Sequence, residues 1–241
     1  MKTGLLKAAL LGGAFFFTSY LTLSAQSTRD SASVWSIYYS AGWKSSNLEK
    51  LNRRLAQNSY PSFQEGMVTL GVGFQENREG TVGMLEFLSS RMQNVSSAGK
   101  TFSYMDFLIN LNFGYEVLKT GSFTMYPTAG LGYGGQYLSI TTERDFNEIL
   151  QNPVEQNVTL WNHNLSINAA LNADYRTAAD ETPHGKQRFW LVGLRGGYTF
   201  APLHWWRQNN AMLDVENSPK SNVTGPFVQV RLGLSTKAKD E

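Results

Sequence analysis

The sequence predicts an all-β fold, an eight-stranded antiparallel up-and-down transmembrane β-barrel with a short helix in the first external loop. Three observations support this. Segments of about ten residues alternate apolar side chains with small, polar or charged ones, an export signal precedes them, and their connections alternate between long and short. Successive side chains of a strand point to opposite faces, so each segment has one apolar and one polar face.

The N-terminus has the pattern of a secretory signal peptide. Lys2 and Lys7 give a basic start, residues 8–23 are largely apolar, and Ala25 precedes the expected cleavage point before Gln26. This apolar run is too short for a convincing spanning helix, which needs roughly 20 predominantly apolar residues. We therefore expect a signal peptide at 1–25, a periplasmic N-terminal segment at 26–33, the barrel at 34–236 and a periplasmic polar tail at 237–241.

The composition of the chain fits one all-β domain that is rich in turns. It has 22 Gly, 7 Pro and 13% aromatic residues. A net charge of +2 gives no indication of a large nucleic-acid surface, and the absence of Cys means that no disulfide holds the fold. Stability must therefore come from closure of the ladder and from burial of the apolar faces, in lipid or in a core.

The expected strands share the same alternation. The clearest one places Ile109 and Leu111 on the outward face and Asn110 and Asn112 on the inward face. No later segment is suited to cross a bilayer as a helix, so a membrane location requires strands. We expect strands at 34–43, 67–75, 81–89, 102–118, 123–138, 161–176, 189–200 and 226–235.

The connections alternate in length. Those at 44–66, 90–101, 139–160 and 201–225 are long, and those at 76–80, 119–122 and 177–188 are shorter. In an up-and-down barrel the two sets lie at opposite ends, and outer-membrane barrels have short periplasmic turns and long external loops. The long loops are therefore expected outside. A soluble eight-stranded barrel of the lipocalin type also has uneven loops and remains the alternative.

Charged residues are expected inside the barrel. The interior of an eight-stranded barrel is just wide enough to be filled by side chains, and an unpaired charge in it is costly. We therefore expect an ion-pair network in the lumen, which argues against a diffusion pore. Its expected members are Glu86, Glu116, Asp174, Arg195 and Arg231.

Two motifs and the cleavage site carry a resemblance to a known group of proteins. They are the segment 193–200 (GLRGGYTF), the segment 126–134 (YPTAGLGYG) and the Ala25-Gln26 junction. The chain resembles the eight-stranded outer-membrane β-barrel proteins common in Bacteroidetes, broadly the OmpX and OmpA barrel families. The resemblance implies the fold and an outer-membrane location. One departure is that the last strand ends at Leu234-Ser235 and a polar tail, whereas many barrels end in an aromatic residue.

Two loop features are candidates for binding a partner. Leu48, Leu51 and Leu55 lie at i, i+3 and i+7 and form one apolar stripe on a short helix, which either covers the barrel mouth or docks a partner. Trp205 and Trp206 fall in the last loop, as anchors at the membrane interface or as contacts for a partner.

The sequence gives little support for catalysis. Its three histidines are His163, His184 and His204, and the spacing of His163 and Ser166 puts them on opposite faces of a strand. No histidine or carboxylate spacing indicates a metal site. We expect no enzyme activity, no metal and no cofactor, and keep a lipid A-modifying enzyme as the least favoured alternative.

The expected function is that of an accessory or structural subunit. A filled barrel offers a lipid-facing wall and external loops, through which it would join a larger outer-membrane complex. The expected partners are outer-membrane lipid and lipopolysaccharide, together with a larger outer-membrane protein or lipoprotein, and no nucleic acid. The alternative is a self-sufficient surface barrel, either an adhesin or a membrane-stabilising protein.

Overall fold

A computed structural model of the chain describes residues 33–142, 158–177, 180–181, 186–208, 213–215 and 217–237. The predicted signal peptide and His184 lie outside these ranges, as do residues 26–32 and 238–241. The division of the chain into segments therefore stays a prediction. Within the described ranges, no helix is long and apolar enough to span a membrane.

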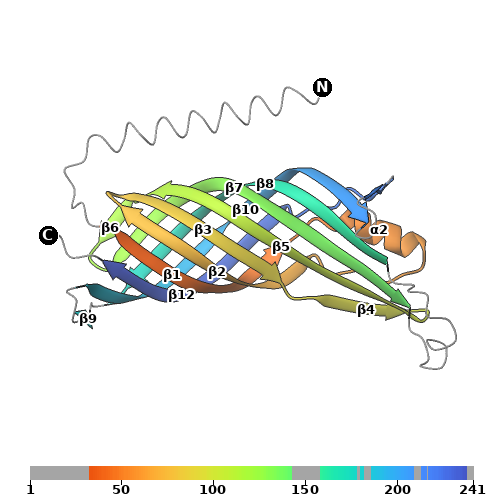
Figure 1. The fold of residues 1–241 in the computed structure, drawn as a ribbon, viewed down its shortest axis with the longest axis horizontal. Coiled ribbons are helices and arrows are strands. Elements are labelled where there is room, and N and C mark those ends of the chain that lie inside the picture. Colours follow the sequence, from red (N-terminus) through yellow and green to blue (C-terminus); the bar gives the residue numbers. More distant parts are fainter. Residues whose placement is uncertain are drawn as a thin grey trace, which may run out of the picture.

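Eight strands form a closed antiparallel ring, which confirms the predicted fold class (Figure 1). The ring closes because its first strand pairs with both the second and the last, and its fourth and fifth strands in chain order also pair. The remaining ladders join consecutive members of the ring. The members of the ring are β1 (Val34–Ser45), β2 (Gly66–Arg78), β3 (Thr81–Ser90), β5 (Lys100–Tyr115), β7 (Phe123–Thr142), β8 (Val158–Arg176), β10 (Gln187–Gln208) and β12 (Gly225–Lys237).

One end of the barrel carries tight turns, and we call it the turn end. Glu79 and Gly80 join β2 to β3 with positive φ angles of 53° and 82°, as a two-residue hairpin turn requires. Gly121, with φ 55°, turns the short strand β6 (Leu118–Thr120) into β7. β1 begins and β12 ends here, since Val34 pairs with both Asn77 and Lys237.

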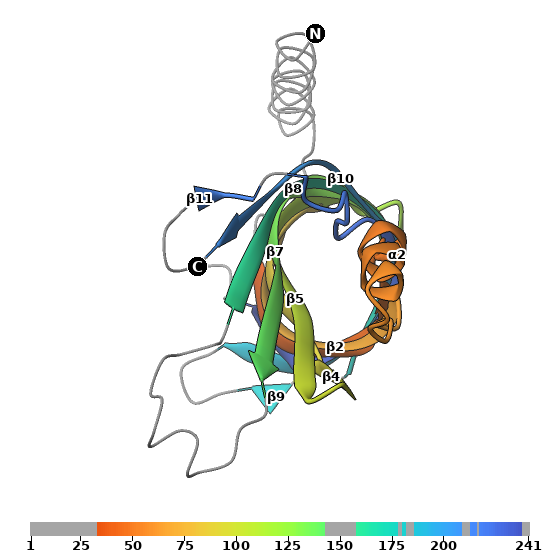
Figure 2. The same cartoon turned by 90° about the vertical axis from the view of Figure 1, so that its right-hand side faces the viewer.

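The opposite end carries the helix, and we call it the loop end. The helix α2 (Glu49–Gln57) lies between β1 and β2 and packs against the ring (Figure 2). The sequence did not predict the strand β4 (Gln93–Ser97). This strand forms a hairpin with the start of β5, through a turn at Ala98 and Gly99. The short strand β11 (Leu213–Asp214) pairs with the end of β10 here, whereas another short strand, β9 (Asp180–Glu181), pairs with the start of β10 at the turn end.

Several predicted strand ends are wrong. The strand predicted at 102–118 ends at Tyr115, because the amide of Glu116 bonds to Gly80 and that of Val117 bonds to Met125, which moves the chain to a new partner. The strand predicted at 189–200 instead continues to Gln208, through a register shift between Phe200 and Leu203. β7 and β8 also run beyond their predicted limits at the loop end.

Candidate functional site

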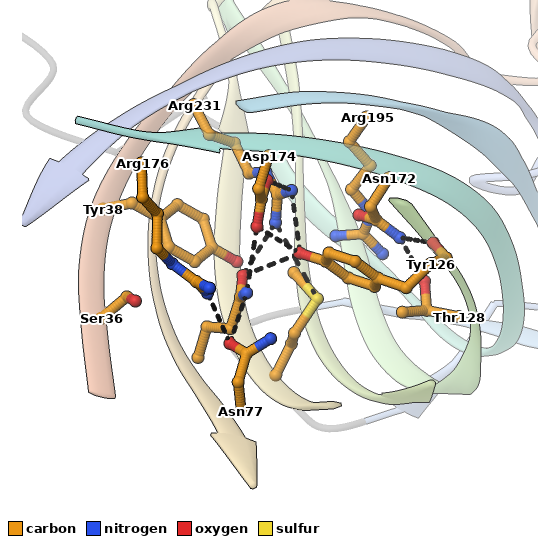
Figure 3. A network of polar contacts seen from close by, with 12 residues as sticks. Ser36, Tyr38, Asn77, Tyr126, Thr128, Asn172, Asp174, Arg176, Arg195 and Arg231 are labelled. Atoms are coloured by element: carbon orange, nitrogen blue, oxygen red, sulfur yellow. Dashed lines mark hydrogen bonds and ion pairs between the residues drawn. The ribbon is translucent and has the colours of Figure 1, made fainter. Parts of the chain in front are cut away.

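The first ion pair of the lumen joins β12 to β8. The Arg231 guanidinium lies 2.5 Å from Asp174 Oδ1, and neither side chain is exposed. Tyr126 donates its hydroxyl hydrogen to Asp174 Oδ2 at 2.7 Å and accepts from Arg231 at 3.1 Å. Arg231 also donates to Gln75 Oε1 and lies over the ring of Tyr38. Figure 3 shows these side chains converging inside the barrel.

The second ion pair joins β10 to β3. Arg195 Nη1 contacts Glu86, and both side chains are fully buried. Tyr38 donates to the other carboxylate oxygen of Glu86 at 3.4 Å and also contacts Arg231, so it links the two pairs. Arg195 stacks over the ring of Phe227. Each charge is therefore matched inside the wall, as burial of charge requires.

Glu116 is not part of these two pairs. Its carboxylate accepts from Asn77 at 2.9 Å and lies 3.9 Å from Lys119, at the turn end of the lumen. Arg176 donates to the same Asn77 side chain at 2.9 Å. Gln75 also donates to the Asn77 side chain, at 2.8 Å, and to Asp174 Oδ2, at 3.1 Å. The five residues predicted to form one network are therefore connected, as two buried ion pairs and one carboxylate near the turn-end opening.

Sequence reasoning missed a third buried ion pair. Lys44 Nζ lies 2.9 Å from Asp106 Oδ2, which also accepts from the Ser46 hydroxyl at 2.6 Å, and all three side chains are buried. The predicted first strand stopped at Trp43, which left Lys44 in a loop. A signal was present, because Lys44 continues the inward series through Tyr38, and Asp106 is in phase with the inward Asn110.

Two glycines make room for the large side chains of the lumen. A Cβ atom placed on Gly193 would lie 2.5 Å from Asp174 Oδ1 and 3.0 Å from Arg231 Nε. A Cβ atom on Gly73 would overlap the ring of Tyr38. Because glycine faces these groups across the ladder, an arginine and two tyrosines fit side by side in a narrow barrel.

The leucine stripe of α2 faces into the molecule. Leu48, Leu51 and Leu55 are 0%, 3% and 6% exposed and form one apolar cluster with wall residues such as Phe102 and Leu138. The stripe is therefore not available to an outside partner, and of the two interpretations the geometry agrees with the helix that covers the barrel mouth. Its polar face carries an exposed Arg53–Glu49 ion pair.

Trp205 and Trp206 lie in β10, so the prediction that they belong to a loop is wrong. Because consecutive strand residues face opposite sides, Trp206 points inward, is 3% exposed and donates to Pro219 O at 2.8 Å. Trp205 points outward and stacks on His163, with ring centroids 5.5 Å apart. Only Trp205 is placed to contact lipid or a partner.

The outer wall is apolar over the middle of the barrel and is bordered by aromatic rings. Leu70, Leu131 and Val230 are 64%, 66% and 55% exposed, and they represent a surface formed by all eight strands of the ring. Aromatic side chains border this band towards the loop end. They point outward from four adjacent strands, β5, β7, β8 and β10, and contact one another from strand to strand. They are Phe107, Tyr133, Tyr137, Trp161, His163 and Trp205. An apolar band bordered by aromatic side chains is the surface of a transmembrane barrel.

Beyond this aromatic border the two faces exchange character. Along β5 the outward residues change from Ile109 and Leu111 to Ser103, while the inward ones change from Asn110 and Asn112 to Phe102 and Tyr104. β7 changes in the same way, with Ser139 outward and Leu138 inward. On these two strands the outward face thus becomes polar where the strands rise past the apolar band, which indicates that the loop end stands in water.

His163, the histidine considered as catalytic, is not brought together with Ser166. His163 points outward and shares a hydrogen bond of 2.6 Å with the Tyr133 hydroxyl, whereas Ser166 is buried on the inward face. In the ranges that the structure covers, no group of three or more His, Cys, Asp or Glu residues could hold a metal ion.

Comparison with known proteins finds structural resemblance only. No protein-family model matches the sequence, and no curated protein matches it. The structure resembles Ail, the attachment invasion locus protein of Yersinia pestis, with 11% identity, a TM-score of 0.42 and coverage of 87% of this chain and 100% of that chain. A major outer membrane protein from Thermus thermophilus has 12% identity and a TM-score of 0.43, with coverage of 86% of this chain and 99% of that chain. Neisserial surface protein A has 11% identity and a TM-score of 0.38, with coverage of 88% of this chain and 98% of that chain.

Proposed function

We propose that this protein is a non-porous barrel of the bacterial outer membrane, with its loop end outside the cell. The apolar band, its aromatic border and the exchange of polarity beyond it support a membrane position. The first strand of the ring begins and the last strand ends at the turn end, as expected where the turns face the periplasm. The signal peptide pattern at residues 1–25 supports export.

The observation that carries the non-porous function is the filled interior. Arg231–Asp174 and Arg195–Glu86 lie in the lumen with no exposed surface, and Lys44–Asp106 lies nearer the loop end. Above them, α2 seals one side of the mouth with an apolar cluster. A solute would have to displace paired charges from their partners, which costs several kcal/mol for each pair.

A filled barrel acts through its outer surfaces, and we assign to this one the role of an accessory or structural subunit of a larger outer-membrane complex. The wall is uneven, because β5, β7, β8 and β10 rise past the aromatic border and carry the hairpin β4 (Figure 1). This extension and the wall below it form a broad one-sided surface. A larger outer-membrane protein or lipoprotein is the partner we propose for it, alongside outer-membrane lipid and lipopolysaccharide.

The experiment compares the two sides of the barrel by site-specific photo-crosslinking in native membranes. A photoreactive residue replaces Trp205 on the aromatic border or, as the matched control, Leu70 of β2, which lies three strands further round the ring and away from the extended strands; both positions face outward. The subunit role predicts one stoichiometric protein adduct from position 205 and none from position 70. Lipid adducts alone from both positions, together with a free monomer in mild detergent, would reject it.

The second candidate is a self-sufficient surface barrel, either an adhesin or a membrane-stabilising protein. The burial of the α2 leucines favours this candidate, because these apolar side chains already pack within the chain and leave no apolar surface on α2 for a partner to cover. This candidate predicts monomeric behaviour and surface binding that depends on the β4–β5 hairpin. The lipid A-modifying alternative needs His163 and Ser166 to cooperate, and they face opposite sides of β8.

A further inference from the structure

The mouth of the barrel holds a cavity of about 280 Å³ between α2 and the inward face of the extended strands. Its lining is mostly apolar and comes from five different elements. The side chains that matter most are Leu51 and Leu55 of α2, Phe102 of β5, Leu138 of β7, Leu160 of β8 and Trp206 of β10.

The cavity is held open by fixed elements. The Asn52 side chain binds both the amide and the carbonyl of Phe63 at 2.9 Å, which ties α2 to the segment that follows it. Asn47, just before the helix, pairs with Asn222 through two backbone hydrogen bonds. Apolar cavities are poor sites for water, and one of about 150 Å³ stays dry and binds benzene. This cavity is thus suited to an apolar group.

The cavity is a closed-ended pocket. Towards the turn end, the next inward residues are Gln136 on β7 and Asn162 on β8, and on β5 Asp106 follows the inward Tyr104. Gln136 and Asn162 are joined by a 2.7 Å hydrogen bond, and Asp106 is held by Lys44 and Ser46. An apolar chain that entered from outside would stop at this polar layer, since going further would leave buried polar groups without partners.

The entrance carries a positive charge. Arg54 and Asn58 of α2 line the cavity and are exposed, and Arg54 donates to the carbonyl of Asn217 at 3.1 Å. Within the described residues, no ion pair includes Arg54, whereas its neighbour Arg53 is paired with Glu49. A cation at the mouth of an apolar pocket is complementary to a ligand with an apolar body and an anionic end.

We propose that this pocket binds a free medium-chain fatty acid, with the chain under α2 and the carboxylate at Arg54. The volume lies near the lower limit of ordinary ligand pockets, about 300 Å³, which fits one chain and not a two-chain lipid. The proposal goes beyond the subunit role and is independent of it, because the pocket lies at the mouth and not on the outer wall. It concerns ligand binding only and involves no chemical step.

The test measures quenching of Trp206 by 11-bromoundecanoic acid. The full mature chain is placed in lipid nanodiscs without detergent, and the Trp206 signal is the difference between the wild type and Trp206→Phe. The pocket predicts saturable quenching of this difference. A purely linear response, as from acid dissolved in the bilayer, would overturn the proposal. So would equal quenching from bilayer lipids with brominated chains and no free acid.

Two pairs of variants locate the ligand. Ile140→Phe with Leu160→Phe fills the pocket and is expected to weaken binding at least tenfold, whereas Leu165→Phe with Ile167→Phe, on the outer wall of β8, leaves it unchanged. Arg54→Gln is expected to weaken binding of the acid roughly two- to fivefold, and Arg53→Gln has no effect. Binding of the neutral 11-bromoundecanol should not respond to Arg54→Gln. Binding that survives the filled pocket, or an equal loss for acid and alcohol, would contradict the proposal.

Discussion

The lumen and the mouth of this barrel are filled in opposite ways. In the lumen, inward side chains are polar and charged, and Arg231 and Arg195 each have a carboxylate partner. In the mouth, inward side chains are apolar and pack under the leucines of α2. The same strands, β5 and β7, contribute to both regions. The difference shows that the solvent outside the wall, and not the strand itself, decides which face is apolar.

The physical reason lies in the alternation of a strand. Where lipid surrounds the wall, apolar residues face outward and the lumen receives the polar ones, which need partners. Where water surrounds it, as beyond the aromatic border, the apolar residues turn inward and need a cover, which α2 provides. Charge pairing should therefore be most sensitive in the lumen, and apolar packing in the mouth.

The largest effect is expected from breaking one lumen pair. Arg231→Met leaves Asp174 buried without its cation and should lower the free energy of unfolding by about 3–5 kcal/mol. The control is Arg53→Met, which removes an exposed pair and should cost less than about 1 kcal/mol. Urea unfolding in lipid vesicles measures both. Equal losses would show that burial does not distinguish the two pairs.

The outer face gives the next effect. Leu171→Arg places a charge on the apolar band and should destabilise the barrel by about 2–4 kcal/mol. Ser139→Arg, which faces outward beyond the aromatic border, should change stability by less than about 0.5 kcal/mol. Folding titrations in the same vesicles compare them. A similar penalty at both positions would mean that the border is misplaced.

The mouth should respond locally. Leu51→Ala removes packing beneath α2 and should destabilise the helix by about 2–3 kcal/mol, while the ring stays intact. Hydrogen exchange of the α2 amides, compared with that of β12, separates local from global opening. The exposed Gln57→Ala serves as the control. Equal loss of amide protection in α2 and β12 would contradict local opening, because it would show that the mouth and the ring unfold as one cooperative unit.

The smallest effect tests the room that glycine leaves in the lumen. Gly193→Ala places a methyl group against Asp174 and Arg231 and should cost about 1–2 kcal/mol. Gly196→Ala on the same strand meets nothing nearer than Phe227 O at 3.9 Å, so it should be close to neutral. Thermal unfolding of the two variants, followed by gel mobility, gives the comparison, and equal melting would contradict tight packing at Gly193.

The central strands were predictable because their period of two follows a constant lipid environment. Ile109 and Leu111 therefore predicted both the strand and its outward face. Strand ends were not predictable in this way, because the pattern inverts past the border. In β7 the apolar Leu138 faces inward, whereas the apolar Leu131 below the border faces outward. In β10 the register shift after Phe200 also interrupts the alternation, and the predicted strand consequently ended before Trp206.

The composition of the lumen was partly predictable, but its pairing was not. The phase of each strand places Arg195 and Glu86 on the inward face, yet they are far apart in the chain and meet only through the register of the closed ring. Glu116 has the same phase and lies instead beside Asn77. Lys44 was missed because it lies one residue before the end of β1, where the sequence pattern does not distinguish strand from loop.

The most direct test of the central claim is the conductance of the full mature chain in a planar lipid bilayer. Because three buried ion pairs and a covered mouth fill the interior, we predict no steady conductance above the bilayer alone, while the protein stays folded by gel mobility. Glu86→Ala with Arg195→Ala should then introduce brief current steps. Stable channels formed by the unaltered folded protein would contradict a sealed barrel.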